Sequence, residues 1–276
     1  MKAGRVHAVL AAGVENPRLL ARWRREPELL RGCGVEPSEL DLDALWKFAG
    51  LTAKVRHNGL RADLPLTFRL MSVAGLEIEV FAAYASALAS EGRRYAATTA
   101  ERAQDLLAFL ERWLDFERRE HALLRDMFRY ELALARLRGL PATDDAAAAD
   151  ATASRPTPRA SSVARVRGHV VLHEMRCDPR QVGALLQEKS PRLGEAALGA
   201  FHFCYWRAGA AAEIHVLQLD ELGFYLLTLA DGARTVAEMG RALGGGGRPA
   251  KWLLKALGEL AAVGVLTFET NGGRAR

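Results

Sequence analysis

The order of helix and strand signals in residues 213–269 constrains the fold of this chain more than any other feature. A strand pattern, EIHVLQL, is followed by three helical patterns and a closing strand. Asp220 can cap the first helix by accepting from the free amides of its opening turn. Thr235 and Glu238 form a Thr-x-x-Glu capping box at the second helix, and Pro249 opens the third, where its missing amide is not needed. A strand, three helices and a final wing strand in this order are typical of a winged helix.

The residues ahead of these helices change from helical periodicity to alternation. FHFCYWRAG and AAEIHVLQL predict two strands joined by a Gly/Ala turn, and VARVRGHVVLHEM predicts one further strand before them. We therefore predict a C-terminal domain, residues 163–276, in which a small antiparallel sheet packs on the winged helix.

Residues 140–162 separate this domain from the first half of the chain. They read LPATDDAAAADATASRPTPRASS and contain almost no large apolar residues, so burial cannot offset the entropy of ordering them. We predict a flexible linker here. Residues 1–139 are almost wholly helical in pattern, which gives an α+β fold class: an N-terminal all-α domain followed by the winged-helix domain.

The helical domain is expected to hold five or six helices. Leu45, Phe48 and Leu51 have the spacing of a core-facing helix that ends at Asn58-Gly59. A second pattern runs over residues 65–92. The third begins at a capping box formed by Thr98 and Glu101, and because it continues for about forty residues we expect a break near residues 115–119.

Apolar run lengths and cysteine spacing argue against a membrane-spanning or a secreted protein. No apolar run approaches the ~18 residues that a transmembrane helix needs, and the opening MKAGRVHAVLAAGV is interrupted by His7 and followed at once by Glu15, so a signal peptide is not expected. The three cysteines are widely spaced and form no Cys-x-x-Cys pair, which fits a reducing compartment. We expect a soluble, cytoplasmic protein.

The sequence nominates no catalytic residue and no metal site. Glu117, Glu120 and His121 cluster on a predicted helix, but the second Glu-x-x-His pair that a di-iron bundle needs is missing. We expect a solvated charged face there. The glycine run before Pro249 lacks the Lys-Ser/Thr ending of a phosphate-binding loop, so we interpret it as a spacer.

The choice of ligand for the winged helix lies between DNA and a peptide. A net charge of +5 favours nucleic acid, because phosphate contacts dominate that affinity. The third helix argues against it, since its noncore positions carry Lys251, Trp252, Lys255, Gly258 and Glu259 and no Arg, Asn or Gln to read base edges. Trp252 and the small Gly258 suggest a shallow apolar groove instead.

A strand at residues 213–219 offers a second half to such a groove. If it borders the sheet, its unpaired backbone groups can accept an extended peptide as one more strand. The alternative is that VARVRGHVVLHEM or the linker covers this edge.

Two stretches resemble known families. Residues 214–268, with LDELGFYLLTLADGARTVAEM and LGELAAVGVL at their centre, resemble the PqqD-like precursor-recognition elements of ribosomally made peptide natural products. PLTFRLMSVAGLEIEVFAAYASAL and LLRDMFRYELALARLR are similar to the helical part of partner proteins of multinuclear non-haem iron oxidases, as in the methanobactin, 3-thiaglutamate and aminopyruvatide pathways. A broad family related to the helical domain has been described as DNA-binding, so a winged-helix transcriptional regulator remains the alternative.

The resemblance implies a non-catalytic subunit. It would bind the leader of a precursor peptide and present the peptide to a separate iron oxidase, which would hold the iron, so no cofactor and no metal ligand are expected in this chain. The helical domain would dock on the oxidase to form a heterodimer. The residues expected to bind peptide are Glu213, Ile214, His215, Val216 and Leu217 on the strand and Lys251, Trp252, Lys255 and Glu259 on the third helix. The lysines would suit an acidic leader.

Overall fold

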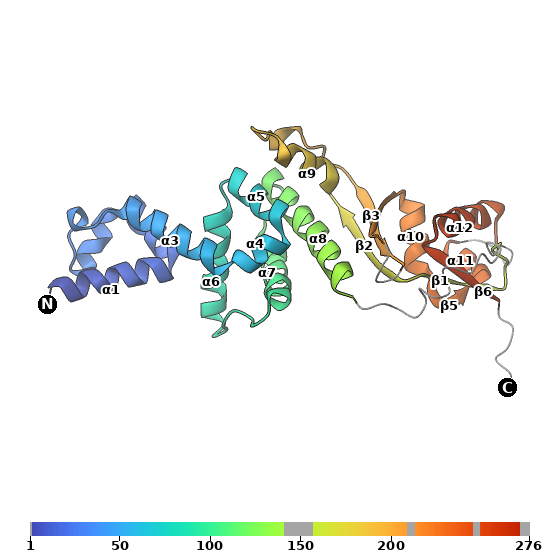
Figure 1. Ribbon diagram of the computed structural model, residues 1–276, viewed down its shortest axis with the longest axis horizontal. Coiled ribbons are helices and arrows are strands. Elements are labelled where there is room, and N and C mark those ends of the chain that lie inside the picture. The colour runs from blue at the N-terminus through green and yellow to red at the C-terminus, as the bar shows by residue number, and fades with distance from the viewer. Residues whose placement is uncertain (1, 141–156, 209–212, 245–248, 271–276) are drawn as a thin grey trace. The chain divides into compact units, whose positions relative to one another are not determined.

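The structure, a computed structural model, describes residues 2–140, 157–208, 213–244 and 249–270 (Figure 1). Helices and two small antiparallel sheets give a mixed α+β fold. Two compact units make up the chain: residues up to Leu132 together with Pro179–Ala196, and Ala133–Asp178 together with the residues from Ala197 onward. Residues 141–156, most of the predicted linker, lie outside the described residues. The boundaries predicted at 139 and 163 stay predictions.

The first unit is helical. Its elements are α1 (Lys2–Glu15), α2 (Pro17–Arg25), η1 (Pro27–Cys33), η2 (Pro37–Glu39), α3 (Leu42–Arg56), α4 (Asn58–Asp63), α5 (Pro65–Val73), α6 (Glu77–Ser90), α7 (Thr99–Trp113), most of α8 (Arg119–Gly139), α9 (Pro179–Gln187) and η4 (Leu193–Glu195). The helices outnumber the five or six expected, in part because the pattern over residues 65–92 is divided and a separate short helix, α4, follows α3.

One division lies in the pattern over residues 65–92. Gly75 has φ +70°, a left-handed conformation that glycine adopts readily, and α5 ends before it while α6 begins after it. The expected end at Asn58-Gly59 is wrong as well, because these residues open α4. The break expected near residues 115–119 is confirmed between α7 and α8, and so is the Thr98–Glu101 capping box.

Two long-range contacts hold α5 in this unit. The buried carboxylate of Glu131, on α8, accepts from the amides of Leu66 (2.9 Å) and Thr67 (2.7 Å) and so replaces the missing N-cap side chain of α5. Arg69 donates from its guanidinium to the carbonyl of Leu186 at the end of α9. The segment Pro179–Ala196 therefore belongs to the helical unit, although the residues before and after it in the sequence belong to the other unit.

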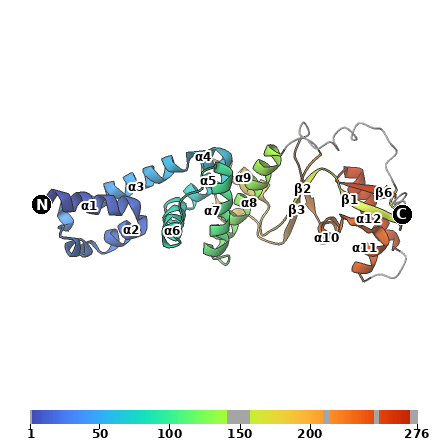
Figure 2. The ribbon, with the colours of Figure 1, turned by 90° about the horizontal axis from the view of Figure 1, so that it is seen from below.

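The second unit contains both sheets and the C-terminal helices. Its remaining elements are β1 (Ser162–Val166), β2 (His169–Met175), β3 (Phe201–Arg207), β4 (His215–Leu219), α10 (Glu221–Leu229), β5 (Asp231–Thr235), α11 (Val236–Ala242), α12 (Lys251–Val263) and β6 (Leu266–Thr270). One sheet has the order β5-β1-β6 and the other β2-β3-β4, all antiparallel. Figure 2 shows α11, α12 and β6 gathered around β1.

The single strand predicted from VARVRGHVVLHEM is wrong. The chain forms two strands, β1 and β2, which belong to different sheets. Gly168 lies between them with φ +68°, and a Cβ there would stand 2.4 Å from the carbonyl oxygen of Arg207. Only glycine fits this turn.

The helix signals of this unit are largely confirmed. Asp220 caps α10 by accepting from the amide of Gly223, and Thr235 and Glu238 form the capping box of α11. The third helix starts slightly late, with Ala250 as N-cap rather than at Pro249. Side chains from both sheets and from α10, α11 and α12 share one apolar core.

Candidate functional site: an edge strand and an exposed helix face

The strand predicted at residues 213–219 forms over His215–Leu219 and borders its sheet, so Glu213 and Ile214, predicted as strand contacts, lie just before the strand. In the described residues β4 pairs with β3 alone, with Trp206 opposite His215 and Cys204 opposite Leu217. VARVRGHVVLHEM does not cover the outer side of β4, because β2 pairs on the opposite side of β3 and β1 lies in the other sheet. An exposed strand edge presents unpaired backbone groups that another extended segment can bond.

Alternation decides which side chains of β4 face the helices. Leu217 and Leu219 pack against the core shared with α10 and α12, together with Cys204 and Trp206 of β3. His215 lies on the same face and remains exposed. Burial raises the pKa of the Cys204 thiol to about 12, so this buried cysteine stays protonated and is no nucleophile.

Trp206 connects this strand to the end of α12. Its ring stacks on His215 with 5.1 Å between centroids, and its Nε1 donates to the carbonyl of Arg167 at 2.7 Å. Gly264 caps α12 with φ +95°, and a Cβ there would stand 3.1 Å from the Trp206 ring. The start of β4 and the C-terminal end of α12 therefore meet at one buried indole. Sequence reasoning did not select Trp206.

The predicted helix contacts lie on the solvent face of α12. Lys251, Trp252, Lys255 and Glu259 are all exposed, and Lys255 forms an ion pair with Glu259 at 3.8 Å. Val263, also exposed, stands about three turns after Trp252 and so on the same face. This face has an apolar side chain at each end and charged groups between them.

The two halves of the predicted site are only partly brought together. Trp206 places His215 at the Gly264 end of α12, whereas Lys251 and Trp252 lie at the other end, about 18 Å away along the helix axis. No side-chain hydrogen bond or ion pair joins residues 213–217 to the four predicted residues of α12 within the described ranges. Val263 is the exposed apolar residue nearest to Gly264 in the chain, and sequence reasoning missed it.

The opposite edge of the same sheet carries a hollow that the sequence did not predict. Five successive residues, 168–172, line it, together with Leu137, Leu140, Val166 and Leu227. Because successive side chains of a strand point to opposite faces, a hollow lined in this way runs along the edge of β2. The sheet thus offers two edges, and a test of peptide binding must distinguish them.

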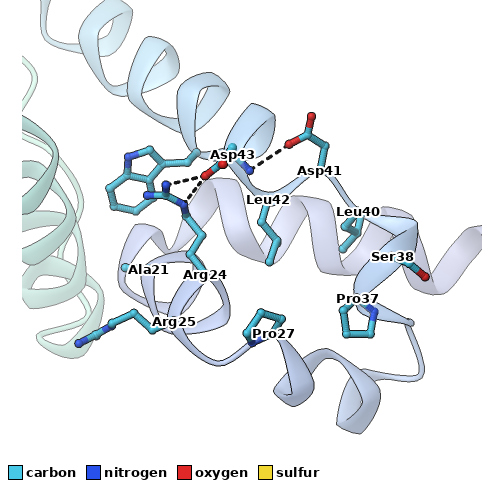
Figure 3. A pocket seen from close by; sticks show the side chains of 11 residues that line it. Ala21, Arg24, Arg25, Pro27, Pro37, Ser38, Leu40, Asp41, Leu42 and Asp43 are labelled. Atoms are coloured by element: carbon cyan, nitrogen blue, oxygen red, sulfur yellow. Dashed lines mark hydrogen bonds and ion pairs between the residues drawn. The ribbon is translucent and has the colours of Figure 1, made fainter.

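A larger pocket in the helical unit is lined by polar groups that already form hydrogen bonds with one another (Figure 3). Arg24 donates to Asp43 at 2.9 Å, and Asp41 accepts from the first amides of α3. The guanidinium of Arg24 also lies 5.0 Å from the ring of Trp46. These contacts hold α3 against α2 and give no reason to expect a catalytic or ligand-binding role for these residues.

The remaining candidates for chemistry have structural roles. His121 is buried rather than on the expected solvated face, and its Nδ1 accepts from the amide of Asp115 in the turn between α7 and α8. Burial, with Arg118 nearby, lowers the pKa of His121. In the described ranges no cluster of three or more His, Cys, Asp or Glu could hold a metal ion, and no helix combines the length and apolarity needed to cross a bilayer.

No protein-family model matches this chain, and a search of the curated proteins finds no match.

Proposed function

We propose that this chain is the non-catalytic partner subunit of a multinuclear non-haem iron oxidase. Its second unit is a winged-helix recognition element that binds the leader of a ribosomally made precursor peptide. The observation that carries the proposal is the position of β4, whose outer edge has no strand partner among the described residues, beside helices that share its core. An extended leader can add there as a fourth strand, with alternate side chains facing α12.

The exposed face of α12 supports a peptide more than DNA. Its cations are Lys251 and Lys255, and Lys255 already has Glu259 as a neighbour at 3.8 Å. A DNA recognition helix needs side chains that form paired hydrogen bonds to base edges. The exposed face of α12 instead carries the apolar side chains of Trp252 and Val263. Such a face suits the apolar side chains of a leader, and the lysines suit its acidic ones.

The function follows from effective concentration. Once the leader is held on β4, the residue to be modified searches a small volume around the complex instead of bulk solution. The iron and the oxygen chemistry belong to the oxidase, and the helical unit docks on it in the cytoplasm as a heterodimer. This chain contributes binding and orientation.

Binding of a fluorescein-labelled leader peptide tests the proposal; its sequence comes from the short precursor reading frame that the proposal expects next to the gene for this chain. Trp252→Ala and Lys255→Glu should each weaken binding at least about fivefold, which corresponds to roughly 1 kcal/mol. On α3, Phe48→Ala is the corresponding removal of an exposed aromatic side chain and Lys47→Glu repeats the charge reversal. Both should leave the affinity unchanged, and all four variants should unfold at the wild-type temperature. If the wild type and both α12 variants bind the leader with equal affinity, the exposed face of α12 is not part of the binding site.

A labelled random DNA duplex provides the competing test. A regulator should bind it with micromolar affinity that falls steeply as salt rises. If the chain binds DNA in this way and does not bind the leader, the proposed function is wrong and the chain is a DNA-binding regulator.

A further inference from the structure

A stripe of exposed apolar side chains runs along α3. Phe48, Leu51 and Val55 are 56 %, 58 % and 63 % exposed, although large apolar side chains are normally covered. They account for three of the eight large exposed apolar side chains in the described residues. Their spacing of three and four positions places them on one face of the helix. This stripe, Phe48, Leu51 and Val55, is called the α3 stripe below.

The helix that carries the α3 stripe is held on its other side. Leu45 and Ala49 are buried in the core formed by α1, α2 and α3. Gly50 packs so closely on α6 that a Cβ would stand 3.1 Å from the side chain of Ile78. At the start of the helix, Asp43 is bonded to Arg24 (Figure 3). The α3 stripe is therefore displayed by a fixed helix, as a preformed binding surface requires.

Charges of one sign flank the stripe. Lys47 is exposed on one side of it and Arg56 on the other. Thr52, also beside the stripe, donates its hydroxyl to the carbonyl of Phe48 and adds no charge. A complementary partner has an apolar centre with carboxylates at its rim.

We infer that the α3 stripe is the surface on which a protein partner docks through an apolar patch with an acidic rim. This inference rests on the proposed function, under which that partner is the iron oxidase. The stripe belongs to the helical unit, and the peptide edge belongs to the other unit. Apolar side chains at the centre of an interface usually provide most of its affinity.

Other occupants fit the flanking charges less well. A second copy of this chain would bring Lys47 and Arg56 of each copy towards the same cations of the other, and like charges oppose such a contact. An anionic membrane would accept the cations, but each contributes only about 1 kcal/mol near a lipid surface, which makes two cations and three apolar side chains a weak anchor.

The test uses the full chain and the purified oxidase encoded beside it. Surface plasmon resonance measures their affinity, and light scattering measures the mass of each species. The double variant Phe48→Ser/Leu51→Ser should bind the oxidase at least about 30-fold more weakly, the effect of losing an interface hot spot. Val73→Ser, on α5, is a control that changes another exposed apolar side chain and should leave oxidase binding unchanged. The double variant should unfold at the wild-type temperature with wild-type helical circular dichroism, which shows that the helical unit is folded, and it should keep wild-type affinity for the labelled leader.

The outcomes separate this inference from the proposed function. If the wild-type chain binds the oxidase and the double variant binds it equally well, the docking surface is wrong while the proposed function stands. If the wild-type chain does not bind the oxidase, the proposed function itself fails. The inference is also overturned if the substitutions abolish a wild-type dimer, or abolish binding to vesicles of phosphatidylcholine and phosphatidylglycerol, without affecting oxidase binding.

Discussion

The buried histidine of the helical unit makes the stability of this protein sensitive to mild acid. The ring of His57 is 2 % exposed and stacks on Phe81 with 4.1 Å between centroids. Its Nδ1 has no hydrogen-bond partner among the described residues. Burial, followed by the nearby charges of Arg56 and Arg102, lowers the pKa of His57 from 6.5 to about 4.

The sign of the effect follows from proton linkage. Because the folded pKa is lower, the unfolded chain takes up a proton at a pH where the folded chain does not. Stability is therefore complete above pH 6.5 and falls as the pH drops towards about 4. The two pKa values correspond to a total loss of about 3 kcal/mol, of which somewhat less than half is already lost at about pH 5.5.

His57→Phe retains an aromatic ring for stacking and removes the titrating group. Urea titrations from about pH 8 to about pH 5 give the free energy of unfolding of the wild type and the variant. Groups that titrate in both proteins cancel, so wild-type stability minus variant stability should fall by about 1 kcal/mol by about pH 5.5. A difference between wild type and His57→Phe that stays constant over this range refutes the reasoning.

Two further substitutions test contacts that fix the fold. Glu131→Ala leaves the half-buried amide of Leu66 and the buried amide of Thr67 without their acceptor and should cost about 3 kcal/mol of unfolding free energy in urea titrations. A loss below about 1 kcal/mol contradicts the capping role. Gly264→Ala places a Cβ at φ +95° against the ring of Trp206 and should cost about 2 kcal/mol, lowering the melting temperature by several degrees. An unchanged melting temperature contradicts that packing.

Local signals in the sequence predicted helix ends well. Both Thr-x-x-Glu capping boxes form, at Thr98 and at Thr235, because each needs only residues three positions apart. Glycine turns inside apolar patterns were harder to predict. Gly75 and Gly168 both adopt a left-handed backbone within a run of otherwise regular periodicity, and at Gly168 the close approach of the Arg207 carbonyl leaves no room for a side chain.

Features that depend on distant parts of the chain could not be predicted from local patterns. Helical spacing places Leu45, Phe48 and Leu51 close together, but the helices that pack around α3 bury Leu45 and leave the other two exposed. The position of β4 at a sheet edge was only a conditional prediction, because strand order is nonlocal. The role of Trp206 was missed, since its contacts come from residues far apart in the chain.

Hydrogen exchange of the second unit with and without the leader peptide tests the central claim most directly. If the leader adds to the sheet as a fourth strand, backbone amides within residues 213–219 slow on binding, while those of β2, along the opposite edge, exchange as before. Unchanged exchange in residues 213–219 at saturating leader contradicts the account. Protection confined to β2 contradicts it too, by moving the binding site to the other edge of the sheet.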